Sequence, residues 1–290
     1  MTGRASVVAL AVLLPLAGCG SPPSDGGQLL VVASTSIVGD LVAGVVGDEA
    51  AVDVLIPVGA DPHDFAPSAR QAASLRETDL VVTSGLGLEV GLADALEAAQ
   101  DEGVPILELG PALDPRPIGG CGSRSPDPHW WLDPVRAARG VDLIAERLQK
   151  IAVGSWVVRG SRIRRRARGP RRRAAGHDAF GYFADRYGFD VIGVVIPGGA
   201  TQAAPDPKAL AALAEIIREE GVPAVFAETT LPTNVAEALA AEVGGEIDVV
   251  MLYTGSLGEP GSGADTYVSL LRTNVERIVE VLGLTPCSTG

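Results

Sequence analysis

From residue 28 onward, short runs of β-branched and other apolar residues alternate with longer amphipathic stretches. The short runs predict strands, and the stretches between them predict helices. Buried strands that are each separated from the next by one helix are typical of a parallel sheet covered on both faces. In the first half, the predicted strands are residues 29–33, 52–56, 80–83 and 105–109, and the predicted helices are residues 37–46, 68–77 and 90–101.

The second half of the chain repeats this pattern. Its predicted strands are residues 191–195, 224–227 and 247–252, and its predicted helices are residues 207–220, 232–243 and 265–282. Helix starts are marked by Pro207 and Pro232, and helix ends by Gly221, Gly244 and Gly283. We therefore predict an α/β fold of two lobes, each a parallel β-sheet flanked by helices, with ligand-binding loops at the carboxyl ends of the strands.

The predicted lobes are residues 29–133 and 177–290, and residues 134–176 connect them. The connection begins with a bridging helix that ends near residue 151. Nine arginines then lie between residues 159 and 173, and no acidic residue lies between Glu146 and Asp178. This segment is either a genuine insertion or the product of a shifted reading frame. Its triple arginine, residues 171–173, is not expected to form a buried parallel strand, because desolvating unpaired charges is costly.

The first residues have the pattern of a secretory signal. Arg4 precedes an apolar run at residues 7–14 that is too short to span a bilayer, and Leu16-Ala17-Gly18-Cys19 follows. This tetrapeptide resembles a bacterial lipobox, so we expect residues 1–18 to be removed and Cys19 to carry a lipid. An ordinary signal with a chance cysteine is the alternative. Residues 19–28 then predict a flexible tether that holds the protein at the extracytoplasmic face of the cell membrane.

Composition indicates a globular protein that does not bind nucleic acid. Hydrophobic residues make up 47% of the chain, which is ample for a core, and the formal net charge of −13 argues against a nucleic-acid partner. The three cysteines are too few for a disulfide scaffold. If Cys19 is lipidated, Cys121 and Cys287 remain, either as a disulfide or as two thiols.

The chain has three histidines, and all three fall on predicted turns between elements. His63 and His129 lie in loops before helices, and His177 lies at a predicted helix start. Each has an acidic residue within two positions, and such a carboxylate can accept a hydrogen bond from a metal-bound imidazole. These acidic neighbours are Asp61, Asp64, Asp127 and Asp178.

Four motifs resemble those of a known family: PHDFAPS at residues 62–68, DPHWWLDP at 127–134, HDAFGYFADRYG at 177–188 and GADTYVSLLRTNVERI at 263–278. With them the chain resembles, from residue 29 to 282, the zinc-uptake type of the metal-binding lipoproteins that serve ABC importers for zinc and manganese. The resemblance implies a metal site in the cleft between the lobes. Its ligands would be His63 and His129 from the first lobe and His177 and Asp265 from the second. From the sequence alone, Asp265 could equally be the N-cap of the last helix.

Three imidazoles and one carboxylate suit Zn²⁺ in tetrahedral geometry. Manganese-binding relatives tend to place a carboxylate where His177 stands, so zinc is the first expectation and Mn²⁺ the alternative. The resemblance also implies a monomer that delivers its ion to the importer's permease. In this mechanism four ligands close over the ion, and the docked permease releases it by loosening one lobe relative to the other.

The sequence also allows two other classes of protein. A zinc-dependent hydrolase needs an open coordination position and a general base, and the chain has no His-Glu-x-x-His motif. Glu228 and Asp178, its candidate bases, fit better as residues that support the site or the fold. A surface adhesin, or a chain that no longer binds metal, is a third interpretation. We therefore expect a binding protein and not an enzyme.

Overall fold

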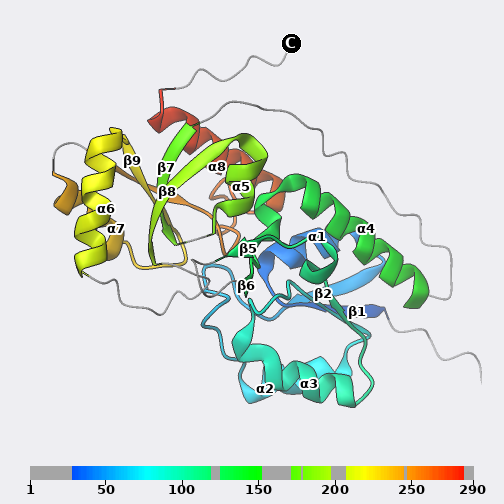
Figure 1. Ribbon diagram of the computed structural model, residues 1–290. Helices are drawn as coiled ribbons and strands as arrows, with labels where there is room; N and C mark the ends of the chain where they lie inside the picture. Colours follow the sequence, from blue (N-terminus) through cyan, green and yellow to red (C-terminus); the bar gives the residue numbers. More distant parts are fainter. Residues whose placement is uncertain are drawn as a thin grey trace, which may run out of the picture.

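The computed structural model describes residues 28–118, 125–151, 171–177, 179–196, 207–244 and 247–283. Two α/β lobes lie side by side, and the long helix α4 (Pro134–Ile151) runs alongside α1 of the first lobe (Figure 1). The predicted fold class is confirmed. None of the helices in these ranges combines the length and the hydrophobicity needed to span a membrane.

The first lobe is built on a parallel sheet with the strand order β2-β1-β3-β4. Its strands are β1 (Leu29–Ala33), β2 (Ala50–Val54), β3 (Leu80–Thr83) and β4 (Ile106–Glu108), and its helices are α1 (Ser36–Val46), α2 (Ala69–Ser74) and α3 (Ala93–Asp101). Alternate residues of the central strands enter different cores: Val31 and Val82 pack on the α1 side, whereas Val32 and Val81 pack on the α3 side. Burial on both faces explains why these strands are continuous apolar runs.

The second lobe has a parallel sheet with the order β10-β9-β7-β8. Its strands are β7 (Arg171–His177), β8 (Phe189–Ile196), β9 (Ala224–Glu228) and β10 (Asp248–Leu252), and its helices are α5 (Gly181–Tyr187), α6 (Pro207–Glu220), α7 (Asn234–Val243) and α8 (Tyr267–Val281). Helices α6 and α7 cover the outer face of this sheet (Figure 1). A small antiparallel pair, β5 (Pro117–Ile118) and β6 (Ser125–Pro126), precedes α4 and was not predicted.

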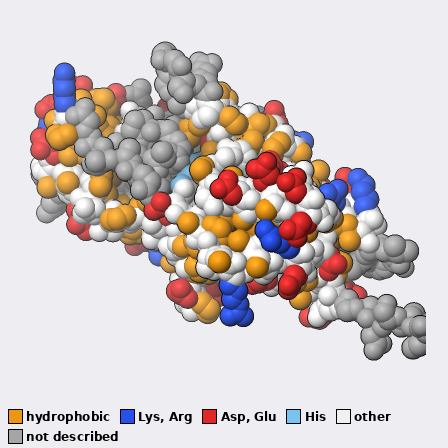
Figure 2. Space-filling model, turned by 90° about the horizontal axis from the view of Figure 1, so that it is seen from below, with side chains coloured by type: hydrophobic (Ala, Val, Ile, Leu, Met, Phe, Trp, Pro, Cys, Tyr) orange, Lys and Arg blue, Asp and Glu red, His pale blue; other side chains and the backbone are white. Residues whose placement is uncertain are grey.

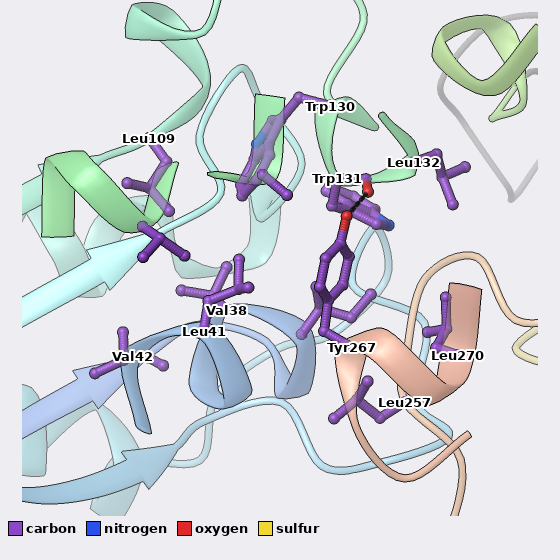
Figure 3. Close-up of a cluster of buried hydrophobic side chains, with 14 of the residues drawn as sticks. Val38, Leu41, Val42, Leu109, Trp130, Trp131, Leu132, Leu257, Tyr267 and Leu270 are labelled. Carbon is purple, nitrogen blue, oxygen red and sulfur yellow. Dashed lines mark hydrogen bonds between the residues drawn. The ribbon is translucent and has the colours of Figure 1, made fainter. Parts of the chain in front are cut away.

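One hydrophobic core joins the two lobes. Val38 and Leu41 of α1 pack with Trp131, and Tyr267 and Leu270 of α8 complete the cluster (Figure 3). The Tyr267 hydroxyl donates to the Trp131 carbonyl at 2.6 Å. In the same region, the Trp131 indole N–H donates to the carbonyl of Thr254 at 2.6 Å. Apolar packing and hydrogen bonds therefore fix the lobes together at the segment that carries His129.

The triple arginine lies in the first half of the parallel strand β7, although the sequence predicted that it would not form a buried parallel strand. The burial of its side chains stays a prediction. Arg171, Arg172 and Arg173 pair with β8 alone, whereas β9 pairs with Ala174 and Ala175 further along β7. The charged residues therefore occupy the end of β7 that has a strand on one side only. His177 is consequently the last residue of a strand and not the first of a helix.

Several predictions concern residues outside the described ranges. They are the signal at residues 1–18, the tether at residues 19–27, the lipidation of Cys19, the pairing of Cys121 with Cys287, and the two interpretations of the segment that precedes β7.

Candidate metal centre

His63 lies in the loop between β2 and α2, and Asp61 shapes this loop. The carboxylate of Asp61 accepts the His63 backbone N–H at 3.0 Å, and its carbonyl accepts the Asp64 N–H at 3.3 Å. Aspartate commonly stabilises tight turns in this way. Ser68 ends the loop as the N-cap of α2, in a capping box with Gln71. The half-buried His63 side chain is thus presented from a turn that is closed at both ends.

His129 lies just before a short 3-10 turn, Trp130–Leu132, at the entrance to α4. Its side chain is 1% exposed and that of its neighbour Asp127 is 2% exposed. One oxygen of Asp127, Oδ1, accepts the His129 backbone N–H at 3.0 Å and lies 2.8 Å from Nδ1 of the ring. A carboxylate can only accept a hydrogen bond, so the proton lies on Nδ1 and Nε2 is the basic nitrogen. This pair was predicted from the sequence as a candidate and is confirmed.

The two histidine rings approach each other at their Nε2 atoms. Nε2 of His63 lies 3.2 Å from Nε2 of His129, and the ring centroids are 5.2 Å apart with an angle of 50° between the planes. Two imidazole nitrogens bound to one tetrahedral zinc ion, at about 2.0–2.1 Å each, lie about 3.3 Å apart. The observed spacing therefore matches that of two ligands of one ion.

A loop of the second lobe, residues 254–257 after β10, closes against the loop of His63. A Cβ atom placed on Gly255 would lie 3.1 Å from Cδ of Pro62, the residue before His63. The Gly59 N–H donates to Oγ of Ser256 at 2.8 Å. The two histidines therefore lie at the junction of the lobes. Histidine atoms are visible at the surface of the face drawn in Figure 2.

His177 ends β7, at the carboxyl edge of the second sheet. Its backbone pairs with Ile196 of β8. The side chain of His177 lies outside the described part of the structure, so its distance to His63 and His129 stays a prediction.

Asp265, the predicted fourth ligand, lies in the turn before α8. Its side chain is exposed and accepts hydrogen bonds from the Gly261 N–H at 3.2 Å and from Oγ of Ser269 at 3.2 Å. The Gly261 bond is the main reason that the pKa of Asp265 is below its usual value. The N-cap of α8 is the next residue, Thr266. Asp265 thus stabilises the turn before α8, and in the described part of the chain no group of three or more His, Cys, Asp or Glu residues is placed to hold a metal ion.

An ion pair ties the segment after His129 to the second lobe. Arg186 of α5 donates to both carboxylate oxygens of the buried Asp133, at 2.7 and 2.6 Å, and Arg136 of α4 donates at 2.8 Å. Burial opposes ionisation of Asp133. The hydrogen bonds from Arg186, from the Val135 N–H and from Arg136 outweigh it, so the pKa of Asp133 is below its usual value. The carboxylate therefore stays charged and anchors α5.

Sequence reasoning missed the loop of residues 254–257. It contains no histidine, cysteine or acidic residue that would mark a metal site. Its residues Thr254, Gly255, Ser256 and Leu257 act through backbone groups, hydroxyls and close packing. Its position directly after a predicted parallel strand was the available signal, since loops at the carboxyl ends of such strands form binding sites.

Comparison of the sequence and the structure with known proteins identifies the family of this chain. The chain matches the family described as zinc-uptake complex component A, periplasmic, over residues 31–153 and 162–281. The manganese-binding lipoprotein MntA of Halalkalibacterium halodurans is 28% identical over 96% of this chain and 97% of its own length. The iron-binding protein YfeA of Yersinia pestis is 28% identical over 96% and 94%. The solved structure of the periplasmic zinc-binding protein TroA of Treponema pallidum superposes with a TM-score of 0.77 at 23% identity, over 88% of this chain and 99% of that one.

These matches run through both lobes and include the loops of His63 and His129. The chain therefore belongs to the zinc-uptake complex component A family, the metal-binding proteins of ABC importers, and is a solute-binding protein and not an enzyme.

Proposed function

We propose that this protein captures Zn²⁺ at the extracytoplasmic face of the membrane and delivers it to the permease of an ABC importer. The observation that carries the proposal is the 3.2 Å separation of the two Nε2 atoms of His63 and His129. It is supported by the buried Asp127, which fixes the ring of His129 with its basic nitrogen toward His63.

Zinc is favoured over manganese by the type of donor. Imidazole nitrogen suits zinc, whereas carboxylate and carbonyl oxygen suit manganese. The relatives are named for manganese, iron and zinc, so membership of the family does not choose among these metals. His63, His129 and His177 supply three nitrogen donors in our proposal, which is enough for tetrahedral zinc with one further donor such as water.

Capture and release follow from the same residues. Imidazoles bind a metal ion only when they are neutral, so acid weakens capture by competition with protons. The ion sits where the loops of both lobes meet, so a permease that loosens one lobe relative to the other separates the ligands. Lipid on Cys19 would hold the protein at the membrane while this takes place.

Calorimetric titration of the purified metal-free protein with Zn²⁺ and with Mn²⁺ tests the proposal. We expect one zinc ion per chain, weaker binding of manganese, and loss of tight zinc binding in a His63→Ala variant. Asp94→Asn is the control, since Asp94 is exposed on α3 and lies in neither histidine loop. Equal zinc affinity in the wild type and in His63→Ala would overturn the proposed site, and tighter binding of manganese than of zinc would overturn the choice of metal.

A further inference from the structure

Glu228 is the one acidic residue of strand β9 and lies at its carboxyl end. The four residues before it are apolar and buried, and Glu228 itself is only 4% exposed. Burying a carboxylate is costly unless it makes hydrogen bonds that compensate for lost water. Glu228 is therefore expected to accept hydrogen bonds, and it lies at the carboxyl edge of a parallel sheet, where ligands bind.

Extending the register of β7 and β9 beyond its printed pairs leads to position 177 opposite Glu228. Strand β9 pairs with β7 through Val225 opposite Ala174 and Phe226 opposite Ala175. Beyond its bulge at residues 173 and 174, β7 continues in regular register with β8 as far as His177. Continuing the β7–β9 register by two residues therefore brings the last residue of β7 opposite the last residue of β9. Neighbouring strands are about 4.8 Å apart, so these two positions are adjacent.

Glu228 also faces the side of the sheet where the lobes meet. Side chains alternate along a strand, so Glu228 shares a face with Phe226, which belongs to the core cluster that contains Trp131. The hydroxyl of Thr254, a buried residue, donates a hydrogen bond to Oε2 of Glu228. The carbonyl of Thr254 accepts the indole N–H of Trp131, whose ring contacts that of His129.

The first lobe shows how such a carboxylate is used. Asp127 is buried, lies at the site and fixes the ring of His129 through Nδ1. We infer that Glu228 is the corresponding positioning residue of the second lobe: its carboxylate accepts the hydrogen of the His177 ring nitrogen that does not face the ion. The inference rests on the proposed function, and it assigns to a residue from another strand a role that the adjacent Asp178 could have been expected to fill.

A double-mutant cycle on the full chain tests this role. Glu228→Gln keeps the shape and an acceptor oxygen but removes the charge, and His177→Ala removes the ring. Loss of a carboxylate that orients a ligating histidine typically lowers metal affinity by about 10–100-fold. We expect Glu228→Gln to weaken Zn²⁺ binding by that amount while the thermal unfolding of the metal-free protein stays close to that of the wild type. Glu219→Gln, on the exposed face of α6, is the matched control.

In the His177→Ala background, Glu228→Gln should weaken zinc binding no further, because its effect passes through the ring. Equal losses in both backgrounds would overturn the inference and assign Glu228 to the fold alone. Wild-type zinc affinity in Glu228→Gln, together with lost zinc binding in His63→Ala, would also overturn the inference. The proposed function would stand in that case. If the wild type itself binds no zinc, the proposed function fails and the inference with it.

A second variant covers the case in which Glu228→Gln does not fold. Thr254→Val removes the hydroxyl that orients the Glu228 carboxylate but leaves the charge in place. It should also weaken zinc binding in the wild-type background and leave it unchanged in His177→Ala. Additive effects of Thr254→Val and His177→Ala would contradict the role of Glu228.

Discussion

At the scale of single residues, the candidate centre depends on how buried carboxylates orient imidazoles. Asp127 uses one oxygen for both the backbone and the ring of His129, so the turn and the ring are fixed together. Asp61 holds the loop of His63 through the backbone N–H. The two aspartates, each two residues before its histidine, therefore prepare the 3.2 Å approach of the rings by different contacts.

Asp127→Asn tests this arrangement. The amide can present an NH₂ group where the carboxylate accepted a hydrogen bond, so His129 can turn its proton toward the ion. We expect zinc affinity to fall by about 10–100-fold, measured by competition with a chromophoric chelator. The exposed Asp94→Asn on α3 should bind zinc like the wild type. An Asp127→Asn variant with wild-type affinity would contradict the role of Asp127.

Asp265→Asn tests the predicted fourth ligand. The Asp265 carboxylate hydrogen-bonds within its own turn and is exposed. We therefore expect the variant to keep zinc affinity close to that of the wild type in the same titration, in contrast to His63→Ala. A loss as large as that of His63→Ala would instead show that Asp265 leaves its turn to bind the ion.

At the scale of elements, much of the fold could be predicted, because parallel strands that are buried on both faces consist of consecutive apolar residues. Strands β1, β3 and β9 were predicted within a residue of their observed bounds. Strand β7 could not be, because its arginines, alanines and glycine have no apolar pattern and its conformation is set by pairing with β8 and β9. This is tertiary context overriding local preference.

The same limit applies to the site. His63 and His129 were identifiable because histidine is rare in this chain and both stand in loops after or between predicted elements. Thr254 and Ser256 were not, because a carbonyl or a hydroxyl that joins two lobes leaves no mark in the sequence. Asp265 lay in a matching motif, but its hydrogen bonds within the turn could only be found in three dimensions.

The ion pair between α5 and the end of the His129 segment yields a prediction at this scale. Arg186→Met should lower the free energy of unfolding by about 1.5–3 kcal/mol at neutral pH, because it removes charge-assisted hydrogen bonds to the buried Asp133 and leaves Arg136 as its remaining cation. Arg76→Met is the control, since its pair with Glu102 is exposed and such pairs contribute about 0–1 kcal/mol. Urea unfolding followed by circular dichroism measures both.

The pH dependence of this loss follows from the lowered pKa of Asp133. A carboxyl whose pKa is lower in the folded than in the unfolded protein adds stability above its unfolded pKa of about 3.9, and that stability is lost as the pH falls through the folded value. The difference between the wild type and Arg186→Met should therefore shrink below about pH 4. A difference that is constant from pH 7 to about pH 3 would contradict the ion pair as its source.

At the scale of the whole molecule, one core and several hydrogen bonds make the two lobes a single unit around the histidines. Trp131 is central, because its carbonyl accepts from Tyr267 of α8 and its indole donates to the loop after β10. The ring of His129 contacts that indole. Trp131 therefore contacts both the second lobe and His129, and a movement of the second lobe would reach His129 through this residue.

The membrane anchor is a separate prediction for the whole molecule. Cys19→Ala removes the lipidation site, so the protein should move from the membrane fraction to the culture medium or the periplasm while its zinc affinity is unchanged. Immunoblotting of fractionated cells measures this. Retention in the membrane fraction would contradict a lipid on Cys19.

The most direct test of a metal site between His63 and His129 is a crystal structure of the zinc-loaded protein with diffraction data collected at the zinc absorption edge. We predict one anomalous peak per chain, at about 2.0–2.1 Å from Nε2 of both histidines, with the ring of His177 as a third ligand. A peak elsewhere, or no peak in a folded protein crystallised with excess zinc, would contradict the account.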